Sequence, residues 1–312
     1  MGVSQDQGRD YLTMINAETA LDLYEAARHR LPRVNYKGDC VPLSDLMELA
    51  DRYDILLFDA FGVLNIGEEA IPGVPKRILE LQAAGKRVMV LTNSASMPHS
   101  ALLEKFTRQG YHFAPEDVIS SRDVLLAHFA PAVGECWGVI VPPELQKGTL
   151  DDFPLTFLED DPVDYKAVNG VLMLGSGGWT AKRQALLNEA LCRQPRPLWV
   201  GNPDIVAPRE SGFSAQPGYF AHHLADRSSI VPRFFGKPFR NIYHYAFSRM
   251  GSEFDPKRTV MIGDSLHTDI LGAQASGIDS ALVVNHGLLA ELCATDEICR
   301  TAIKPDFILT GL

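Results

Sequence analysis

Short apolar runs alternate with longer amphipathic stretches along most of the chain, from Ile55 onward. The apolar runs predict buried strands at 55–58, 87–92, 137–141, 171–174, 198–200, 259–263, 280–284 and 306–309. The amphipathic stretches predict helices at 74–84, 98–109, 181–191 and 241–250. Near-continuous apolar strands separated by helices are typical of a parallel sheet that is covered on both faces. We therefore expect an α/β fold with a doubly wound, mostly parallel sheet and right-handed crossovers.

The middle of the chain has a different composition, which suggests an inserted domain. Residues 121–232 contain Pro-Pro at 142–143, an acidic run at 158–164, a Gly-Ser-Gly-Gly loop at 175–178 and Asn-Pro-Asp at 202–204. We expect a catalytic core at 44–120 plus 233–312 and a smaller inserted α/β cap domain at 121–232, which closes over the strand ends. Residues 1–43 carry an amphipathic segment at 17–31, and we expect a helical N-terminal extension with no visible chemistry.

Polar residues directly follow three of the predicted strands. Asp59 follows the strand at 55–58, Thr92-Asn93-Ser94 closes the strand at 87–92, and Asp264 follows the strand at 259–263. Ligands of such sheets bind outside the carboxyl ends of the strands. The sequence therefore predicts that these residues meet at one edge of one sheet.

These residue types are suited to the transfer of a phosphoryl group. Asp59 and Asp264 would repel each other unless a cation lay between them, and carboxylate oxygens are what Mg²⁺ prefers. Asp269 is close enough in sequence to support such a metal site from behind. Thr92 offers a hydroxyl group, the residues after it offer backbone N–H groups, and Lys237 offers a compact positive charge for a phosphate oxygen. Catalysis of this kind depends mostly on positioning and charge stabilisation.

Four motifs in order make the chain resemble the haloacid dehalogenase (HAD) superfamily. The motifs are LLFDAFGVL at 56–64, VLTN at 90–93, GKP at 236–238 and GDSLHTD at 263–269. The Asn-Pro-Asp at 202–204 resembles a signature in the large α/β cap of class IIA members, which include NagD-like, pyridoxal and phosphoglycolate phosphatases. The resemblance covers about residues 50–312 and implies a Rossmann-like core with this cap.

The resemblance also implies the roles of individual residues. Asp59 would be the nucleophile that becomes an aspartyl-phosphate, with Lys237 beside it. Asp59, the backbone carbonyl of Phe61 and Asp264 would hold Mg²⁺, with Asp269 behind them. The substrate-binding residues would be Thr92, Asn93, Ser94, Lys237, Asn202 and Asp204. The expected substrate is a small phosphorylated metabolite, and a homodimer is an assembly compatible with the resemblance.

The chain departs from the family pattern at one position. The second Asp of the first motif, two residues after the nucleophile, is Phe61 here. In family phosphatases that carboxyl protonates the leaving alcohol and then activates the water that cleaves the aspartyl-phosphate. A phenyl ring can do neither, and loss of a positioned acid–base typically costs about 10²–10⁴-fold in rate.

Three functions remain open from the sequence. The first is a Mg²⁺-dependent phosphohydrolase that is weak or uses a substitute acid, with His99, His267 and Asp204 as candidates for that acid. The second is a phosphometabolite-binding protein on an impaired hydrolase scaffold. The third is a metal-independent hydrolase of the dehalogenase type, because 2-haloacid dehalogenases also place an aromatic residue two positions after the nucleophile. A halide leaving group needs no proton.

Composition narrows the expected partners and compartment. The 312 residues carry 29 Lys and Arg against 39 Asp and Glu, a net charge of −10, which argues against nucleic acid or an anionic membrane as partner. Five scattered cysteines without a C-x-x-C pair argue for a reducing compartment. No signal sequence or membrane-spanning run is visible, and we expect a cytoplasmic protein.

Overall fold

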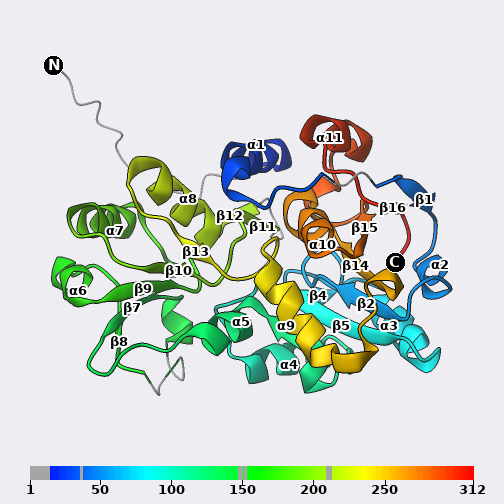
Figure 1. Cartoon of the computed structure of the whole chain (residues 1–312), viewed down its shortest axis with the longest axis horizontal. Helices are drawn as coiled ribbons and strands as arrows, with labels where there is room; N and C mark the ends of the chain where they lie inside the picture. The colour runs from blue at the N-terminus through cyan, green and yellow to red at the C-terminus, as the bar shows by residue number, and fades with distance from the viewer. Residues whose placement is uncertain (1–14, 36–37, 147–149, 151–152, 209–212) are drawn as a thin grey trace.

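A computed structural model describes residues 15–35, 38–146, 150, 153–208 and 213–312. Figure 1 shows two α/β units side by side, each built on its own sheet, with the N-terminal helix α1 (Ala17–Ala27) lying where the two units meet. Among the described residues, no helix is both long and apolar enough to cross a lipid bilayer.

The larger unit is built on a seven-stranded sheet in which every neighbouring pair of strands is parallel. In spatial order the strands are β1 (Val41–Leu43), β16 (Phe307–Leu309), β15 (Asp279–Val283), β14 (Thr259–Gly263), β2 (Ile55–Phe58), β5 (Arg87–Thr92) and β6 (Val118–Ser120). The predicted core strands are all present within about a residue of their expected bounds. The doubly wound, mostly parallel α/β fold is confirmed.

Apolar layers cover both faces of this sheet. Along β2, Leu56 and Phe58 join one buried cluster, while Ile55 and Leu57 join the other. Side chains alternate between the faces of a strand, so an unbroken apolar run needs helices on both sides. The helices that pack in the first cluster are α2 (Met47–Ala50), α3 (Val74–Ala83) and α4 (His99–Arg108). The helices that pack in the second cluster are α5 (Ser121–His128), α9 (Arg240–Met250) and α10 (Leu271–Ser276). The helix α11 (Ala294–Thr301) lies near α1, as Figure 1 shows.

The smaller unit is the inserted cap, built on a five-stranded parallel sheet. Its strands, in spatial order, are β13 (Arg233–Phe234), β10 (Leu198–Val200), β9 (Gly170–Met173), β7 (Trp137–Ile140) and β8 (Leu155–Phe157). Its helices are α6 (Pro162–Ala167), α7 (Ala181–Arg193) and α8 (Pro217–Arg227), and it carries the hairpin β11 (Val206–Pro208) with β12 (Phe213–Ala215). A second hairpin, β3 (Asn65–Ile66) with β4 (Glu69–Ala70), follows β2 in the core.

Three predicted boundaries differ from the structure. The expected extension at 1–43 includes β1, which is an edge strand of the core sheet, and its first 14 residues lie outside the described residues. The cap was expected to begin at 121, but α5 packs with α9 of the core and is joined to β6 by a capping box between Ser120 and Asp123. The core was expected to resume at 233, but β13 pairs with β10 of the cap. The strand β13 has only two residues, which leaves too short a pattern to be recognised in sequence, and β1 has Pro42 at its centre.

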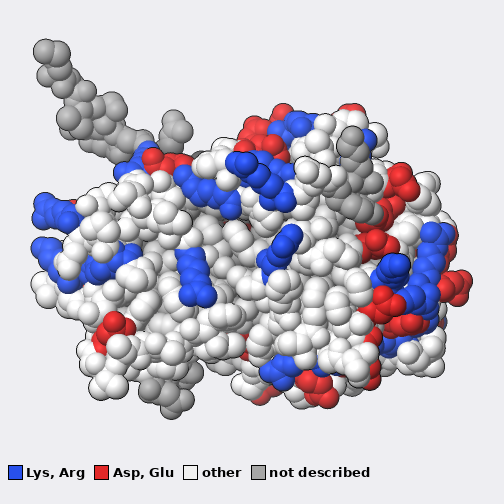
Figure 2. Space-filling model, viewed as in Figure 1, with Lys and Arg blue, Asp and Glu red and all other residues white. Residues whose placement is uncertain are grey.

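The surface charges are mixed rather than segregated on the face in view. Figure 2 shows acidic and basic side chains interspersed at the core end of this face and little charge over its middle. Ion pairs of the core include Arg258 with Asp54 at 2.7 Å and Arg87 with Glu253 at 2.7 Å.

Candidate active site

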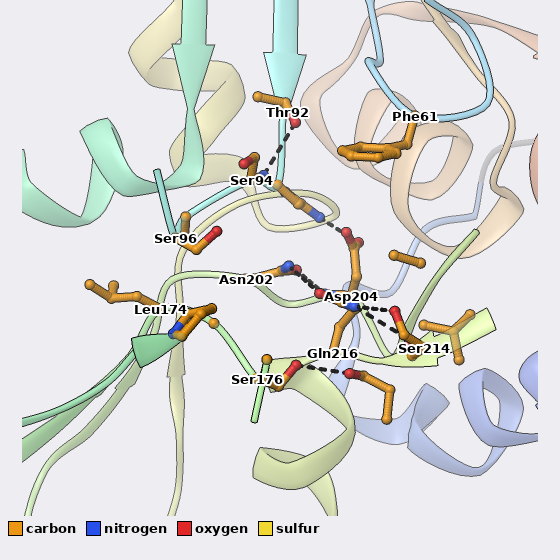
Figure 3. A pocket seen from close by; sticks show the side chains of 18 of the residues that line it. Phe61, Thr92, Ser94, Ser96, Leu174, Ser176, Asn202, Asp204, Ser214 and Gln216 are labelled. Carbon is orange, nitrogen blue, oxygen red and sulfur yellow. Dashed lines mark hydrogen bonds between the residues drawn. The ribbon is translucent and has the colours of Figure 1, made fainter. Parts of the chain in front are cut away.

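The three polar strand ends meet at one cavity between the core and the cap. Because β14, β2 and β5 are neighbours in the sheet, Asp264, Asp59 and Thr92 lie at adjacent strand ends. The cavity has a volume of about 480 Å³, which is the size of a small-molecule site. Figure 3 shows Phe61, Thr92 and Ser94 on the core side, and Asn202, Asp204 and Gln216 on the cap side.

Asp59 and Asp264 line this cavity, and Asp269 lies beside them in a cluster of three carboxyl groups. One oxygen from each of Asp59, Asp264 and Asp269 lies within 4.8 Å of the other two. Burial, followed by the charges of Asp269 and Asp59, raises the pKa of Asp264 well above its usual range. Burial and the charge of Asp59 raise the pKa of Asp269 to about 7. Crowded carboxyl groups of this kind are expensive unless a cation compensates them, so the donor set fits a hard divalent cation.

Glycines allow two loops to approach Asp264 closely. A Cβ atom on Gly287 would lie 1.7 Å from Asp264 Oδ2, and a Cβ on Gly62 would lie 2.5 Å from the same oxygen. Both glycines also have φ near +75°, at +72° and +79°, where other residues are strained. The backbone N–H that follows Gly287, that of Leu288, donates to Asp264 Oδ2 at 2.8 Å. The loop therefore orients this carboxylate.

Lys237 is buried among the same carboxylates. Its Nζ lies 2.5 Å from Asp59 Oδ1 and 2.6 Å from Asp269 Oδ1, and only 1% of its side chain is exposed. Burial lowers the pKa of Lys237, but the charges of Asp269 and Asp59 outweigh it and raise the pKa above its usual value. The ammonium group is therefore a fixed positive charge beside Asp59. Asp269 lies behind the pair, where its Oδ2 also accepts the backbone N–H of Ser265 at 3.1 Å.

Asn93 connects this cluster to the cap rather than facing a ligand with its side chain. Its Oδ1 accepts the backbone N–H of Lys237 at 2.7 Å. Its Nδ2 donates to the carbonyl of Lys237 at 2.9 Å and to Asp204 Oδ1 at 2.7 Å. The donors and the acceptor of the Asn93 side chain are thus bonded within the protein, and substrate binding by Asn93 stays a prediction. Its role is to hold Lys237.

Thr92 and Ser94 lie at the cavity as expected. The Thr92 hydroxyl accepts the backbone N–H of Ser94 at 3.2 Å, and its own proton can be donated to a ligand. Ser94 is half-buried and lines the cavity.

The cap residues Asn202 and Asp204 form an internally bonded loop at the cavity wall. Asn202 Oδ1 accepts the backbone N–H of Asp204 at 2.9 Å, and Asn202 Nδ2 donates to Gln216 Oε1 at 3.3 Å. Burial raises the pKa of Asp204 to about 7, although the hydrogen bond from Asn93 opposes this rise. Asp204 is the one of the three candidate substitute acids that lines the cavity.

The other two candidate acids, His99 and His267, are not among the residues described as lining the cavity, and each contacts a carboxylate elsewhere. His99 Nδ1 lies 3.0 Å from Asp123 Oδ2 in a separate surface depression. His267 is fully buried, with Nε2 2.5 Å from Glu25 Oε1 and its ring stacked on Tyr24. Neither histidine is placed to protonate a group bound at Asp59.

Phe61 lines the cavity where the family's second Asp would stand. The ammonium group of Lys105 lies over its ring, 4.8 Å from the centroid, which is a cation–π distance. Lys105 Nζ also donates to Glu68 Oε1 at 2.8 Å and to the carbonyl of Gly67 at 3.2 Å. The sequence did not single out Lys105 or Gly287, because neither belongs to a recognisable motif.

Comparison with known proteins identifies the family. A model of haloacid dehalogenase-like hydrolases matches residues 56–148, and a HAD-hydrolase-like model matches residues 234–312. The chain is 33% identical over 287 residues to the glycerol-3-phosphate phosphatase of Gallus gallus, covering 83% of this chain and 89% of that protein.

Solved structures show the same fold. A "possible sugar phosphatase" of the HAD superfamily from Cytophaga hutchinsonii aligns with a TM-score of 0.75 at 23% identity, over 86% of this chain and 97% of that one. A glycerol phosphate phosphatase from Mycobacterium tuberculosis, solved in complex with magnesium, aligns with a TM-score of 0.64 at 24% identity, over 83% of this chain and 75% of that one.

The chain therefore belongs to the haloacid dehalogenase-like hydrolases, and within them to class IIA, whose members carry an inserted α/β cap. It is a hydrolase of the phosphatase type.

Proposed function

We propose that this protein is a Mg²⁺-dependent phosphohydrolase that acts on a small phosphorylated metabolite through an aspartyl-phosphate on Asp59. The observation that carries the proposal is the Lys237 ammonium group 2.5 Å from Asp59, since Asp59 lines the cavity together with Asp264. The cluster of three carboxyl groups favours metal-dependent chemistry over the dehalogenase alternative. Relatives named as phosphatases support the same reaction class.

In this proposal Asp59, Asp264 and the backbone carbonyl of Phe61 hold Mg²⁺, which neutralises phosphoryl and carboxylate charge when it is bound. Asp269 keeps Lys237 in place from behind. The Thr92 hydroxyl, the backbone around Ser94 and the Lys237 ammonium group receive the phosphoryl oxygens. Asn202 and Asp204 form the cap wall against which the rest of the substrate lies.

The reaction proceeds in two displacements. A carboxylate oxygen of Asp59 forms a bond to phosphorus while the bond from phosphorus to the leaving oxygen breaks. That leaving oxygen must then gain a proton, and the side chain at position 61 has none to give. Water next attacks the phosphorus of the aspartyl-phosphate, releasing inorganic phosphate and restoring Asp59. Asp204 is the group we assign to both proton transfers: it would give a proton to the leaving oxygen and then take one from the attacking water, because it lines the cavity and its pKa is about 7. From the cap wall it would do so less effectively than a carboxyl group at position 61.

The test of the proposal is the dependence of rate on the leaving group. p-Nitrophenolate leaves without a proton, whereas the alkoxide of glycerol 3-phosphate needs one. With Mg²⁺, we expect turnover of p-nitrophenyl phosphate to exceed that of glycerol 3-phosphate by about 10²-fold or more, because the positioned acid is missing. EDTA should abolish both activities.

Phosphate release is the measurement, with both substrates at saturation. Turnover that persists in EDTA would contradict the metal-dependent mechanism. Equal rates for the two substrates would mean that another group fully replaces the acid lost at position 61. If that group is Asp204, Asp204→Asn should slow the turnover of glycerol 3-phosphate alone.

Phe61 favours one second candidate function, a phosphometabolite-binding protein that does not turn its ligand over. Without a proton donor at position 61, the same cavity still offers Lys237, Thr92 and a metal site to a phosphate group. Ligand-dependent thermal stabilisation of the chain without phosphate release from any substrate would favour this function.

A further inference from the structure

Helix α1 of the N-terminal extension packs between the core and the cap. Its buried side chains lie at three- and four-residue spacings along one face: Ala17, Ala20, Leu21, Tyr24 and Ala27. They belong to an apolar cluster that also contains Ile205 and Val206 of the cap and Leu266 and Leu288 of the core. The helix is therefore part of the surface that joins the two units. It lies outside both family-model matches, at 56–148 and 234–312.

Polar contacts join α1 to the core. Glu25 Oε1 lies 2.5 Å from Nε2 of the buried His267, and Asp22 Oδ1 lies 2.7 Å from Arg300 Nη1. The rings of Tyr24 and His267 stack with centroids 5.1 Å apart and 13° between their planes. His267 belongs to the helical turn Leu266–Ile270, which follows Asp264 and contains Asp269, so α1 contacts the segment that connects these two carboxyl groups.

Other contacts join the extension to the cap. Arg30, just after α1, forms an ion pair with Asp226 of α8, and Ile15, just before α1, forms an isolated β-bridge with Phe213 of β12. The buried hydroxyl of Tyr24 accepts the backbone N–H of Ile205 at 3.1 Å. Figure 1 shows α1 in this position, with β11, β12 and α8 on one side and α10 and α11 on the other.

Tyr24 is the member of α1 that reaches the active site. Its side chain is 3% exposed and lines the cavity together with Asp59 and Asp264. Burial and the nearby charges of Asp204 and Asp264 raise its pKa, so the hydroxyl keeps its proton. The acceptor role toward Ile205 does not depend on that titration.

A continuous series of bonds runs from Tyr24 to the nucleophile. Tyr24 holds the N–H of Ile205, the residue directly after Asp204. The Asp204 carboxylate accepts from Asn93 at 2.7 Å, and Asn93 in turn holds both the N–H and the carbonyl of Lys237. Lys237 Nζ lies against Asp59. Each link is buried or half-buried, so a group left without its partner would be costly.

We propose that Tyr24 is a positioning residue for the reaction at Asp59: α1 holds the cap loop 202–205 against the core, and that loop holds Lys237 through Asp204 and Asn93. The expected effect of Tyr24 on the reaction rate rests on the proposed function. Tyr24 does not need to touch the substrate. It fixes the geometry of groups that do, and small displacements of such groups reduce rate.

The test compares Tyr24→Phe with Tyr165→Phe in the full chain. Tyr165 is a matched control, because it is equally buried and its hydroxyl also makes one bond to the backbone, to the carbonyl of Glu159 at 2.6 Å, away from the cavity. Both variants lose one hydroxyl and should lower the melting temperature similarly. We expect Tyr24→Phe alone to lower kcat for p-nitrophenyl phosphate, by about tenfold with KM nearly unchanged.

Amide hydrogen exchange provides a readout that does not need activity. In Tyr24→Phe the amides of Ile205 and Lys237 should exchange faster, whereas in Tyr165→Phe they should not. Faster exchange at Ile205 with unchanged exchange at Lys237 and unchanged kcat would overturn the positioning role. Equal effects of the two variants on kcat and on exchange at Lys237 would also overturn it. A wild-type chain that releases no phosphate would reject the proposed function, and the exchange at Lys237 would still decide whether Tyr24 positions it.

Discussion

Asp59→Asn should reduce Mg²⁺-dependent phosphate release by at least about 10⁴-fold, as removal of a covalent nucleophile does in other enzymes. The amide of Asn is a poor nucleophile, and it has no charge with which to pair with the Lys237 ammonium group 2.5 Å away. The variant should still fold, because it reduces the repulsion among Asp59, Asp264 and Asp269. Phosphate release at saturating p-nitrophenyl phosphate is the measurement, with the melting temperature recorded alongside.

Asp54→Asn is the matched control for this variant. Asp54 lies directly before β2 and Asp59 directly after it, so the same change is made at the two ends of one strand. Asp54 pairs with Arg258 at the surface, away from the cavity lining, and its variant should keep full activity. An Asp59→Asn variant that retained more than a tenth of wild-type turnover would exclude Asp59 as the nucleophile.

Phe61→Asp should increase turnover of an alkyl phosphate such as glycerol 3-phosphate by about 10²-fold, the lower end of the effect of a positioned acid–base. The carboxyl would stand at the cavity wall, two residues from Asp59, where it could protonate the leaving oxygen and then activate water. We expect the lower end because the Lys105 ammonium group, now 4.8 Å from the ring centroid, would attract the new carboxylate and favour its ionised form. The gain on p-nitrophenyl phosphate should be smaller and should come from the second displacement alone, since that leaving group needs no proton but water must still be activated.

Phe61→Asn separates proton transfer from the effect of a smaller side chain. It has nearly the same shape as the Asp variant but cannot exchange a proton in this way, so it should give no comparable gain. Equal activity of the Asp and Asn variants would mean that the missing carboxyl is not what limits the reaction.

The three strand ends were predictable because each follows an unbroken apolar run. In a parallel sheet the carboxyl ends of neighbouring strands lie together, so Asp59, Thr92 and Asp264 could be placed at one edge from the sequence alone. Lys237 was associated with them by its charge and by the GKP motif at 236–238, not by a strand end.

The contacts made by side chains over long sequence distances were not predictable in this way. Asn93 stands beside Thr92 in a motif, yet its amide is bonded to Lys237, 144 residues away. Tyr24 has the spacing of an ordinary buried helix residue, and nothing in the local sequence points to Ile205, 181 residues later. Periodicity reports which face of a helix is buried but not what that face meets.

The predicted domain boundaries near 43, 121 and 233 differ from the elements of the structure for a related reason. The strand β13 has two residues and shows no alternation that sequence could reveal, and β1 has Pro42, a poor strand residue, at its centre. The helix α5 begins directly after β6, and its capping box at Ser120 joins it to the core although the composition changes near that point.

The central claim, that Asp59 carries the phosphoryl group, is tested most directly by trapping that intermediate. Wild-type protein is mixed with p-nitrophenyl phosphate and Mg²⁺, quenched in acid during steady turnover, and digested for mass spectrometry of the peptide that contains Asp59. Because Phe61 provides no base to activate water, the second displacement should be the slow one, and most of the protein should carry one phosphoryl group on Asp59. Turnover with no phosphoryl group on Asp59, or with the group on another residue, would contradict the account.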